Sequence, residues 1–159
     1  METSGYTTAG GVGVEVQARE VPETALDEIV TALGTRRGGV LSSGMEYPGR
    51  YSRWHLAYVD PCLEIVAQGR RVSARALNDR GRVVLPVVAS CLLATGKPTG
   101  EPTPDRVEVH IAESEDLLPE EMRSRRPTVF TAIREIIAAF RGADPHLGLY
   151  GAFGYDLAF

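Results

Sequence analysis

The chain has 159 residues, 43% of them hydrophobic and 24% charged, a balance typical of one globular domain and unlike a disordered tail. Its net charge of −4 provides no basic footprint, so nucleic-acid binding is disfavoured. The sequence has no run of about 18 apolar residues and no signal-peptide pattern at its N-terminus, so we expect a cytoplasmic protein without a membrane span.

The first 13 residues are rich in glycine, threonine and serine, and they are predicted to be mobile. We therefore divide the chain into a flexible lead-in over residues 1–20 and one globular domain over residues 21–159. The domain begins with a predicted helix over residues 21–34, which Gly34 ends by adopting a left-handed conformation. The apolar stripe of this helix consists of Leu26, Ile29, Val30 and Leu33.

From residue 39 to residue 78 the pattern becomes that of β-strands. Strands are predicted over residues 53–60, 62–67 and 71–77. The second and third are joined by Gln68-Gly69-Arg70, which has the composition of a hairpin turn. A further turn is predicted at Asn78-Asp79-Arg80-Gly81, before the short apolar run 83–85.

Helices are predicted again in the second half of the chain. The first covers residues 86–95, with Pro86 at its start, and a short one covers residues 119–124 after a strand over residues 107–112. The clearest helix covers residues 127–140. Its predicted buried stripe consists of Phe130, Ile133, Ile137 and Phe140.

Residues 147–159, LGLYGAFGYDLAF, have the apolar pattern of a strand. Because no cap or polar tail follows them, we expect the chain to be a piece of a longer protein. Strands outnumber helices, their short turns favour antiparallel pairing, and strict strand–helix alternation is absent. The predicted fold class is therefore α+β, with antiparallel sheets and helices packed on the outside.

Cysteines and histidines give no sign of a catalytic or metal site. Cys62 and Cys91 lie outside any CxxC pair and are interpreted as buried free thiols in a reducing compartment. His55, His110 and His146 accompany no nucleophile motif and are interpreted as structural or surface histidines.

The segment most suggestive of binding is residues 41–52, LSSGMEYPGRYS. It places the hydroxyls of Ser42 and Ser43 before a Pro-Gly turn, and Arg50, Tyr51 and Ser52 after it. If the flanking strands lie side by side, these groups converge on one mouth that suits a free amino acid. The alternative is that the serines merely line a strand end and that Arg50 is solvated.

These residues also carry a resemblance to a known family. Anthranilate synthase component I has a segment that reads roughly LLES…GRYS, which VLSSGMEYPGRYSRW resembles. The variant with synthase and glutamine amidotransferase fused in one polypeptide has segments similar to HLAYVDPCLEIVAQGRRVSARALNDRGRVVLPVV, EMRSRRPTVF and DPHLGLYGAFGYDLAF. The resemblance covers about residues 20–159 and implies the N-terminal, regulatory domain of this family and its fold.

Residue by residue, the resemblance matches Leu41 and Ser43 to the family's Leu-Glu-Ser element, which contributes to the feedback site for L-tryptophan. Ser42 stands where that element has glutamate, so the carboxylate that would meet the tryptophan ammonium is missing. Arg50, Tyr51 and Ser52 match the GRYS portion. The implied tryptophan-binding residues are Leu41, Ser42, Ser43, Arg50, Tyr51 and Ser52, and the rest of the site belongs to a later catalytic domain.

The resemblance implies a parent reaction in which chorismate and glutamine give anthranilate and pyruvate, with magnesium in the full-length enzyme. The magnesium carboxylates, the chorismate-binding groups and the amidotransferase cysteine triad lie outside this chain. We therefore expect no catalytic residue, cofactor or metal site here, and no activity of the chain alone. The implied partners are its own catalytic domain and the glutamine amidotransferase domain in cis, and exposed apolar surface predicts self-association.

Two other hypotheses stay open at this point. The chain could be the same domain of an aminodeoxychorismate or aminodeoxyisochorismate synthase, because the residues that separate these enzymes lie elsewhere. It could also be a stand-alone amino-acid-binding module, although the apolar ending argues against this.

Overall fold

The computed structural model describes residues 2–22, 24–50, 54–113 and 127–154. The short helix predicted over residues 119–124 lies outside these ranges. The strands are β1 (Glu2–Thr7), β2 (Gly13–Ala18), β3 (Gly38–Ser43), β4 (Trp54–Val59), β5 (Leu63–Gln68), β6 (Arg71–Ala76), β7 (Lys97–Pro98) and β8 (Arg106–His110). The helices are α1 (Ala25–Ala32), α2 (Asp79–Thr95) and α3 (Val129–Ala139).

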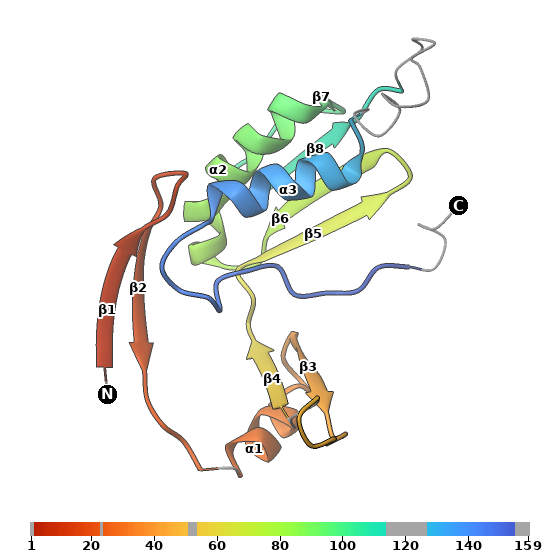
Figure 1. Cartoon of the computed structure of the whole chain (residues 1–159). Coiled ribbons are helices and arrows are strands. Elements are labelled where there is room, and N and C mark those ends of the chain that lie inside the picture. Colours follow the sequence, from red (N-terminus) through yellow and green to blue (C-terminus); the bar gives the residue numbers. More distant parts are fainter. Residues whose placement is uncertain (1, 23, 51–53, 114–126, 155–159) are drawn as a thin grey trace.

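The centre of the fold is an antiparallel four-stranded sheet with the order β5-β6-β8-β7. Helices α2 and α3 pack against each other and cover one face of this sheet (Figure 1). Two further antiparallel pairs, β1–β2 and β3–β4, flank it. The predicted α+β class, with antiparallel sheets and helices on the outside, is confirmed.

The hydrophobic core lies between the four-stranded sheet and the two helices. Successive side chains of a strand point to opposite faces, so β6 and β8 each send alternate small or branched residues into it. The buried residues of the core are Val72, Ala74, Leu85, Val88, Leu92, Val107, Val109, Ile111, Val129, Ala132 and Ile136. The predicted hairpin between β5 and β6 is also present, and its Gly69 has a φ of 56°.

Residues 2–18, within the region that the sequence predicted as a flexible lead-in, form the β-hairpin of β1 and β2. Its turn is held by Thr8, whose hydroxyl accepts a hydrogen bond of 3.1 Å from the Val12 amide. The turn then docks on the end of α3, where the Gly10 amide donates to the Ala139 carbonyl at 2.6 Å. The last carbonyls of a helix lack partners within the helix, so this docking satisfies groups that would otherwise stay unpaired. A local sequence pattern carries no sign of such a distant contact.

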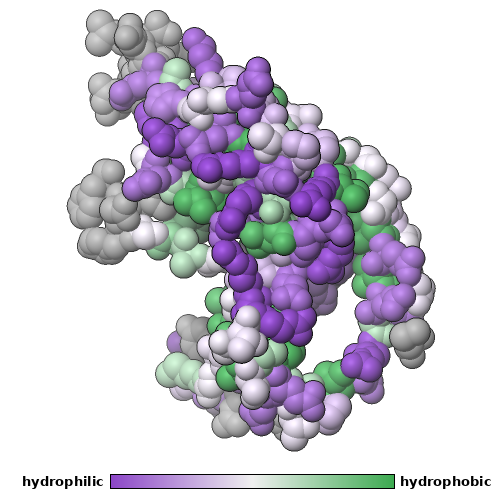
Figure 2. Space-filling model, turned by 180° about the vertical axis from the view of Figure 1, so that it is seen from behind, coloured by the Kyte–Doolittle hydropathy of each residue, from purple (hydrophilic) through white to green (hydrophobic). Residues whose placement is uncertain are grey.

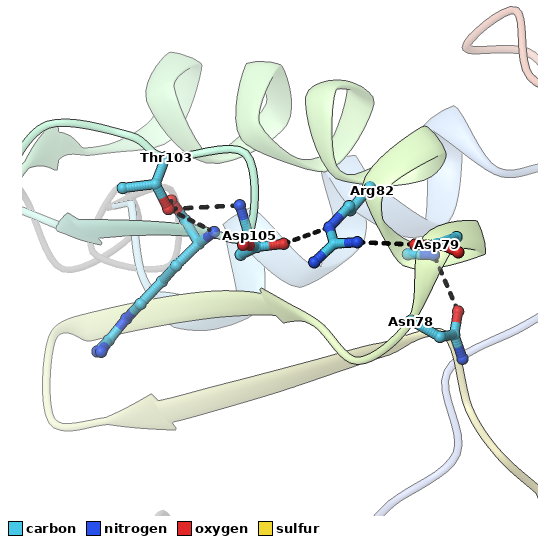
Figure 3. A network of polar contacts seen from close by, with 7 residues as sticks. Asn78, Asp79, Arg82, Thr103 and Asp105 are labelled. Carbon is cyan, nitrogen blue, oxygen red and sulfur yellow. Dashed lines mark hydrogen bonds and ion pairs between the residues drawn. The ribbon is translucent and has the colours of Figure 1, made fainter.

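Helix α2 begins earlier than predicted, because the turn signal before it is in fact its N-terminal cap (Figure 3). The Asn78 side chain accepts a hydrogen bond of 3.1 Å from the Gly81 amide. Arg82 joins Asp79, at 2.7 Å, to Asp105 before β8, at 2.6 Å. These carboxylates raise the pKa of Arg82. Pro86 therefore lies inside the helix, where it has no N–H to donate to the preceding turn.

The other helices differ from their predicted stripes. In α3 the buried side chains are Val129, Ala132 and Ile136, whereas Ile137 is 49% exposed. Of the predicted stripe, Phe130 and Phe140 are partly buried against the core, so the most buried face of the helix is displaced by about one residue from the predicted one. In α1 Val30 is exposed, and Gly34 does not have a positive φ.

Residues 147–154 do not form the predicted strand. Pairing among the described residues gives this segment no neighbouring strand, and its glycines weaken any tendency to extend. Cys62 and Cys91 are free thiols, half-buried rather than fully buried. Burial, with the Glu135 carboxylate as a smaller cause, raises the pKa of the Cys91 thiol. Within the described ranges, no helix combines the length and the apolar character that a membrane crossing requires.

Replacing Gly81 by alanine tests the contact between α2 and the β4–β5 connection. A Cβ at this position would overlap the carbonyl oxygen of Cys62 and lie 3.1 Å from Ala76. Although alanine is favoured over glycine in helices by about 1 kcal/mol, we expect Gly81→Ala to lower the free energy of unfolding by about 1–3 kcal/mol in urea titrations.

The matched control is Gly100→Ala, where a Cβ would meet nothing within 4 Å. This variant should leave the unfolding midpoint nearly unchanged. A Gly81→Ala protein that is more stable than the parent would contradict the packing described for α2.

Candidate functional site

The predicted binding segment forms the paired strands β3 and β4 and the connection between them. In the antiparallel register, Leu41 pairs with Leu56, Ser42 with His55, and Ser43 with Trp54. The strands on the two sides of the turn therefore lie side by side, which is the condition under which the predicted groups converge. Tyr51 and Ser52 lie outside the described residues, so their positions stay predictions.

Strand alternation divides the three predicted residues of β3 between two faces of the hairpin. Leu41 and Ser43 lie on the same face as Trp54 and Leu56, whereas Ser42 lies on the opposite face. The first face is apolar and open, because Leu41 is 40% and Trp54 51% exposed. Helix α1 packs near the second face, where a Cβ at Gly38 would run into Leu33.

Ser42 has a partner that the sequence did not assign to the site. Its hydroxyl shares a hydrogen bond of 2.8 Å with Nδ1 of the exposed His55, and the imidazole tautomer decides which group donates. The strand pattern indicated that His55 lies on β4, but only the register places it opposite Ser42. The Ser42–His55 pair can donate and accept hydrogen bonds, but neither side chain is a carboxylate that could pair with an ammonium group.

The connection between β3 and β4 contains Arg50. Its backbone amide donates to the Tyr47 carbonyl at 3.0 Å, and its guanidinium lies 5.9 Å from the centre of the Tyr47 ring. A cation at this distance from an aromatic face is weakly attracted to it. Arg50 is thus held on its own loop, beside the exposed side chains of Met45 and Tyr47.

A cluster of charges attaches this hairpin to the rest of the fold. Arg36, just after α1, forms an ion pair with Asp60, whose backbone amide donates to the Arg37 carbonyl at 2.8 Å. Arg37 in turn contacts Glu64 on β5 at 2.6 Å, and Arg75 on β6 contacts the same carboxylate at 2.9 Å. The cluster therefore spans α1, the end of β4 and the first two strands of the central sheet.

The surrounding arginines set the pKa values of these two carboxyl groups. The hydrogen bond from Arg36 is the main cause that lowers the pKa of Asp60. The hydrogen bonds from Arg75 and Arg37 lower the pKa of Glu64. A hollow of about 540 Å³ adjoins the cluster and extends to Arg80 at the start of α2, whose guanidinium donates to the Asp60 carbonyl at 3.1 Å. None of the residues predicted for binding lines this hollow.

Among residues 2–22, 24–50, 54–113 and 127–154, no group of three or more histidine, cysteine, aspartate or glutamate side chains could hold a metal ion.

Comparison with known proteins found two relevant relatives. The chain is 47% identical over 162 residues to the anthranilate synthase of Azospirillum brasilense, a match that covers 100% of the chain and 22% of that protein. It is 25% identical over 146 residues to anthranilate synthase component 1 of Haemophilus influenzae, which covers 91% of the chain and 28% of that protein. No protein-family model matches the chain, and no solved structure does. The chain thus spans about a quarter of the length of these relatives.

The lowered carboxyl pKa values predict how acid affects stability. A depressed pKa in the folded state stabilises the fold above the ordinary value, and this stabilisation is lost as the pH falls through the folded-state pKa. We therefore expect the thermal midpoint to fall with acidification below about pH 4. Glu64→Gln should lower the midpoint at neutral pH and flatten this decline, as followed by circular dichroism.

Glu20→Gln, an exposed position outside the cluster, is the matched control and should keep the parental pH profile. Because the pairs are largely exposed to solvent, the effect should be modest and should shrink in high salt. Equal profiles for the two variants would contradict a stabilising role of the cluster.

Proposed function

The chain belongs to the anthranilate synthase family, and on that basis we propose that it is the N-terminal, regulatory part of an anthranilate synthase. The complete enzyme would convert chorismate and glutamine into anthranilate and pyruvate in tryptophan biosynthesis. The observation that carries the proposal is the 47% identity, which extends over the whole chain and only 22% of the relative. Both relatives bear the name anthranilate synthase, which favours this reaction over the aminodeoxychorismate alternatives.

The relative lengths support an enzyme of the fused type. An alignment of 162 residues amounts to 22% of the Azospirillum protein, whereas 146 residues amount to 28% of the Haemophilus component 1. The first protein is therefore the longer one, and it has room for more than component 1 alone. We infer that the present chain belongs with a catalytic domain and a glutamine amidotransferase domain in one polypeptide.

The open face of the β3–β4 hairpin is our proposed contribution to the L-tryptophan feedback site. Leu41, Trp54 and Leu56 offer an apolar surface for an indole ring, and the Ser43 hydroxyl lies beside them on the same face. Ser42 lies on the other face, hydrogen-bonded to His55, and replaces the glutamate of the family element. An ammonium group therefore finds no carboxylate at this position, and we expect feedback inhibition to be weak.

Magnesium belongs to the parent reaction, but the residues described here do not fit it. Asp60 and Glu64 are engaged with arginines, and within the described ranges no set of three ligands is assembled. In our proposal magnesium is held by the catalytic part of the enzyme, and no catalytic step is assigned to this chain.

Exposed apolar side chains suit a surface that other parts of the enzyme cover. Phe153 is 69% and Leu149 is 47% exposed, and Trp54 and Met45 are exposed near the hairpin. Without the remaining domains, such surface favours self-association.

A chimeric enzyme tests the proposed function directly. The segment of the Azospirillum anthranilate synthase that matches this chain would be replaced by the chain itself. We expect the chimera to form anthranilate from chorismate and glutamine in the presence of magnesium, because the two segments share 47% of their residues. The fluorescence of anthranilate measures the rate.

The chain alone is the control and should form no anthranilate, because the proposed catalytic groups lie elsewhere. A folded chimera without activity would contradict the family role of the segment. Activity of the chain alone would contradict the proposal that the catalytic groups lie in other domains.

The open face of the hairpin tests the effector site in the same chimera. Ser43→Glu places a carboxylate on the face that carries Leu41 and Trp54, and a hydrogen bond to a charged group contributes about 1.5–3 kcal/mol. We expect the concentration of L-tryptophan that halves the rate to fall about tenfold, with little change in the uninhibited rate. The control is Ser4→Glu on the exposed strand β1, which adds the same charge far from the hairpin. Equal inhibition curves for the two variants would contradict the proposed site.

A further inference from the structure

One row of side chains crosses the outer face of the four-stranded sheet with an unusual excess of positive charge. In the antiparallel register Gln68 pairs with Arg71, Arg71 with His110, and His110 with Lys97. The neighbours Val72 and Val109 are buried under the helices, so alternation directs this row to the opposite face. Seen from behind, the surface on that side of the molecule is largely hydrophilic (Figure 2).

Like charges directly opposite each other destabilise a sheet, yet this row contains no carboxylate. The nearest acid is Glu108, two positions away on β8, at 3.6 Å from Nε of Arg71. Its carboxylate is also shared with Arg106, at 2.6 Å, and with the Thr99 hydroxyl, at 2.8 Å. These contacts lower the pKa of Glu108, and the Thr99 hydrogen bond is the largest cause. One anion is thus divided between two guanidinium groups, and the row keeps an excess of positive charge.

A hollow of about 280 Å³ opens at the end of this row. Among the described residues it is lined by Gln68, Arg70, Arg71 and His110, none of which carries a carboxylate. The guanidinium of Arg70 is fixed by carbonyl oxygens of Ile111, at 2.7 Å, and of Ala112, at 2.6 Å. Neutral acceptors hold this group in place without cancelling its charge. The hollow therefore offers the fixed guanidinium of Arg70, the guanidinium of Arg71 and the side-chain amide of Gln68 as hydrogen-bond donors.

We propose that the row Arg71–His110–Lys97, with Gln68 and Arg70, is a binding site for an oxyanion, such as the phosphate or carboxylate group of a small metabolite. Arginine donates in the planar geometry that phosphate and carboxylate groups accept. A bound dianion relieves the repulsion within the row.

Proton NMR of the three histidines tests this site with inorganic sulfate, which is a dianion at neutral pH. Sulfate and chloride would be titrated at equal ionic strength into the 159-residue chain at neutral pH. We expect a saturable shift of the His110 ring resonance with sulfate and no such shift of His55 or His146. Malonate and inorganic phosphate then distinguish carboxylate from phosphate preference.

Arg71→Gln should weaken sulfate binding at least tenfold, whereas Arg134→Gln, exposed on α3, is the matched control and should not. Lys97→Gln on the short edge strand β7 gives a second loss-of-charge variant if Arg71→Gln fails to fold. Dispersed methyl resonances of the core report folding in each sample. Equal responses to sulfate and chloride, or equal shifts of all three histidines, would overturn the proposal, and so would unchanged binding in the row variants.

Discussion

Burial of one face of the central sheet under α2 and α3 is the constraint on which the rest of the molecule depends. The side chains of Val72, Ala74, Val107 and Val109 enter this core from two neighbouring strands. Because alternate residues of a strand point in opposite directions, their burial also fixes which residues occupy the outer face. The same packing holds α2 so close to the β4–β5 connection that only glycine fits at position 81. The core thus fixes the point where the β3–β4 hairpin joins the central sheet, as well as the sheet itself.

Charged side chains connect the β3–β4 hairpin to the central sheet, in a region to which the hydrophobic core does not extend. The hairpin is joined to the central sheet by two carboxylates, Asp60 and Glu64, each of which receives hydrogen bonds from arginine. Exposed pairs of this kind contribute little individually, but they link three elements through a short chain of contacts. Asp60 also has a φ of 52°, which is uncommon for a residue other than glycine. Its backbone amide donates a hydrogen bond to the Arg37 carbonyl. An orientation set by a few surface contacts is easier to change than one set by the core.

The sequence predicted elements whose identity is decided locally. Alternation and turn chemistry located β4, β5, β6 and β8, and the turn predicted at Gln68-Gly69-Arg70 is present as the two-residue connection Gly69-Arg70. Features decided by distant contacts were missed. The hairpin over residues 2–18 docks on the end of α3. Helix α2 begins at Asp79, before Pro86, and its first turns contain the buried residues Gly81 and Leu85. Residues 147–154 have the composition of a strand, yet among the described residues they have no strand to pair with.

The candidate site was likewise predictable only where local sequence decides the structure. Sequence reasoning located Leu41, Ser42, Ser43 and Arg50 in one segment. Strand alternation separates Ser42 from Leu41 and Ser43, and only the register places it opposite His55. Shifting the pairing by one residue would exchange the two faces, so a list of site residues cannot state which of them act together. With Leu41 and Ser43 beside exposed Trp54, one face offers apolar surface and a hydroxyl. An amino acid bound there still needs a partner for its ammonium group, and the hairpin supplies none. The hairpin is therefore at most one wall of a binding site, whose opposite wall must come from another part of the enzyme.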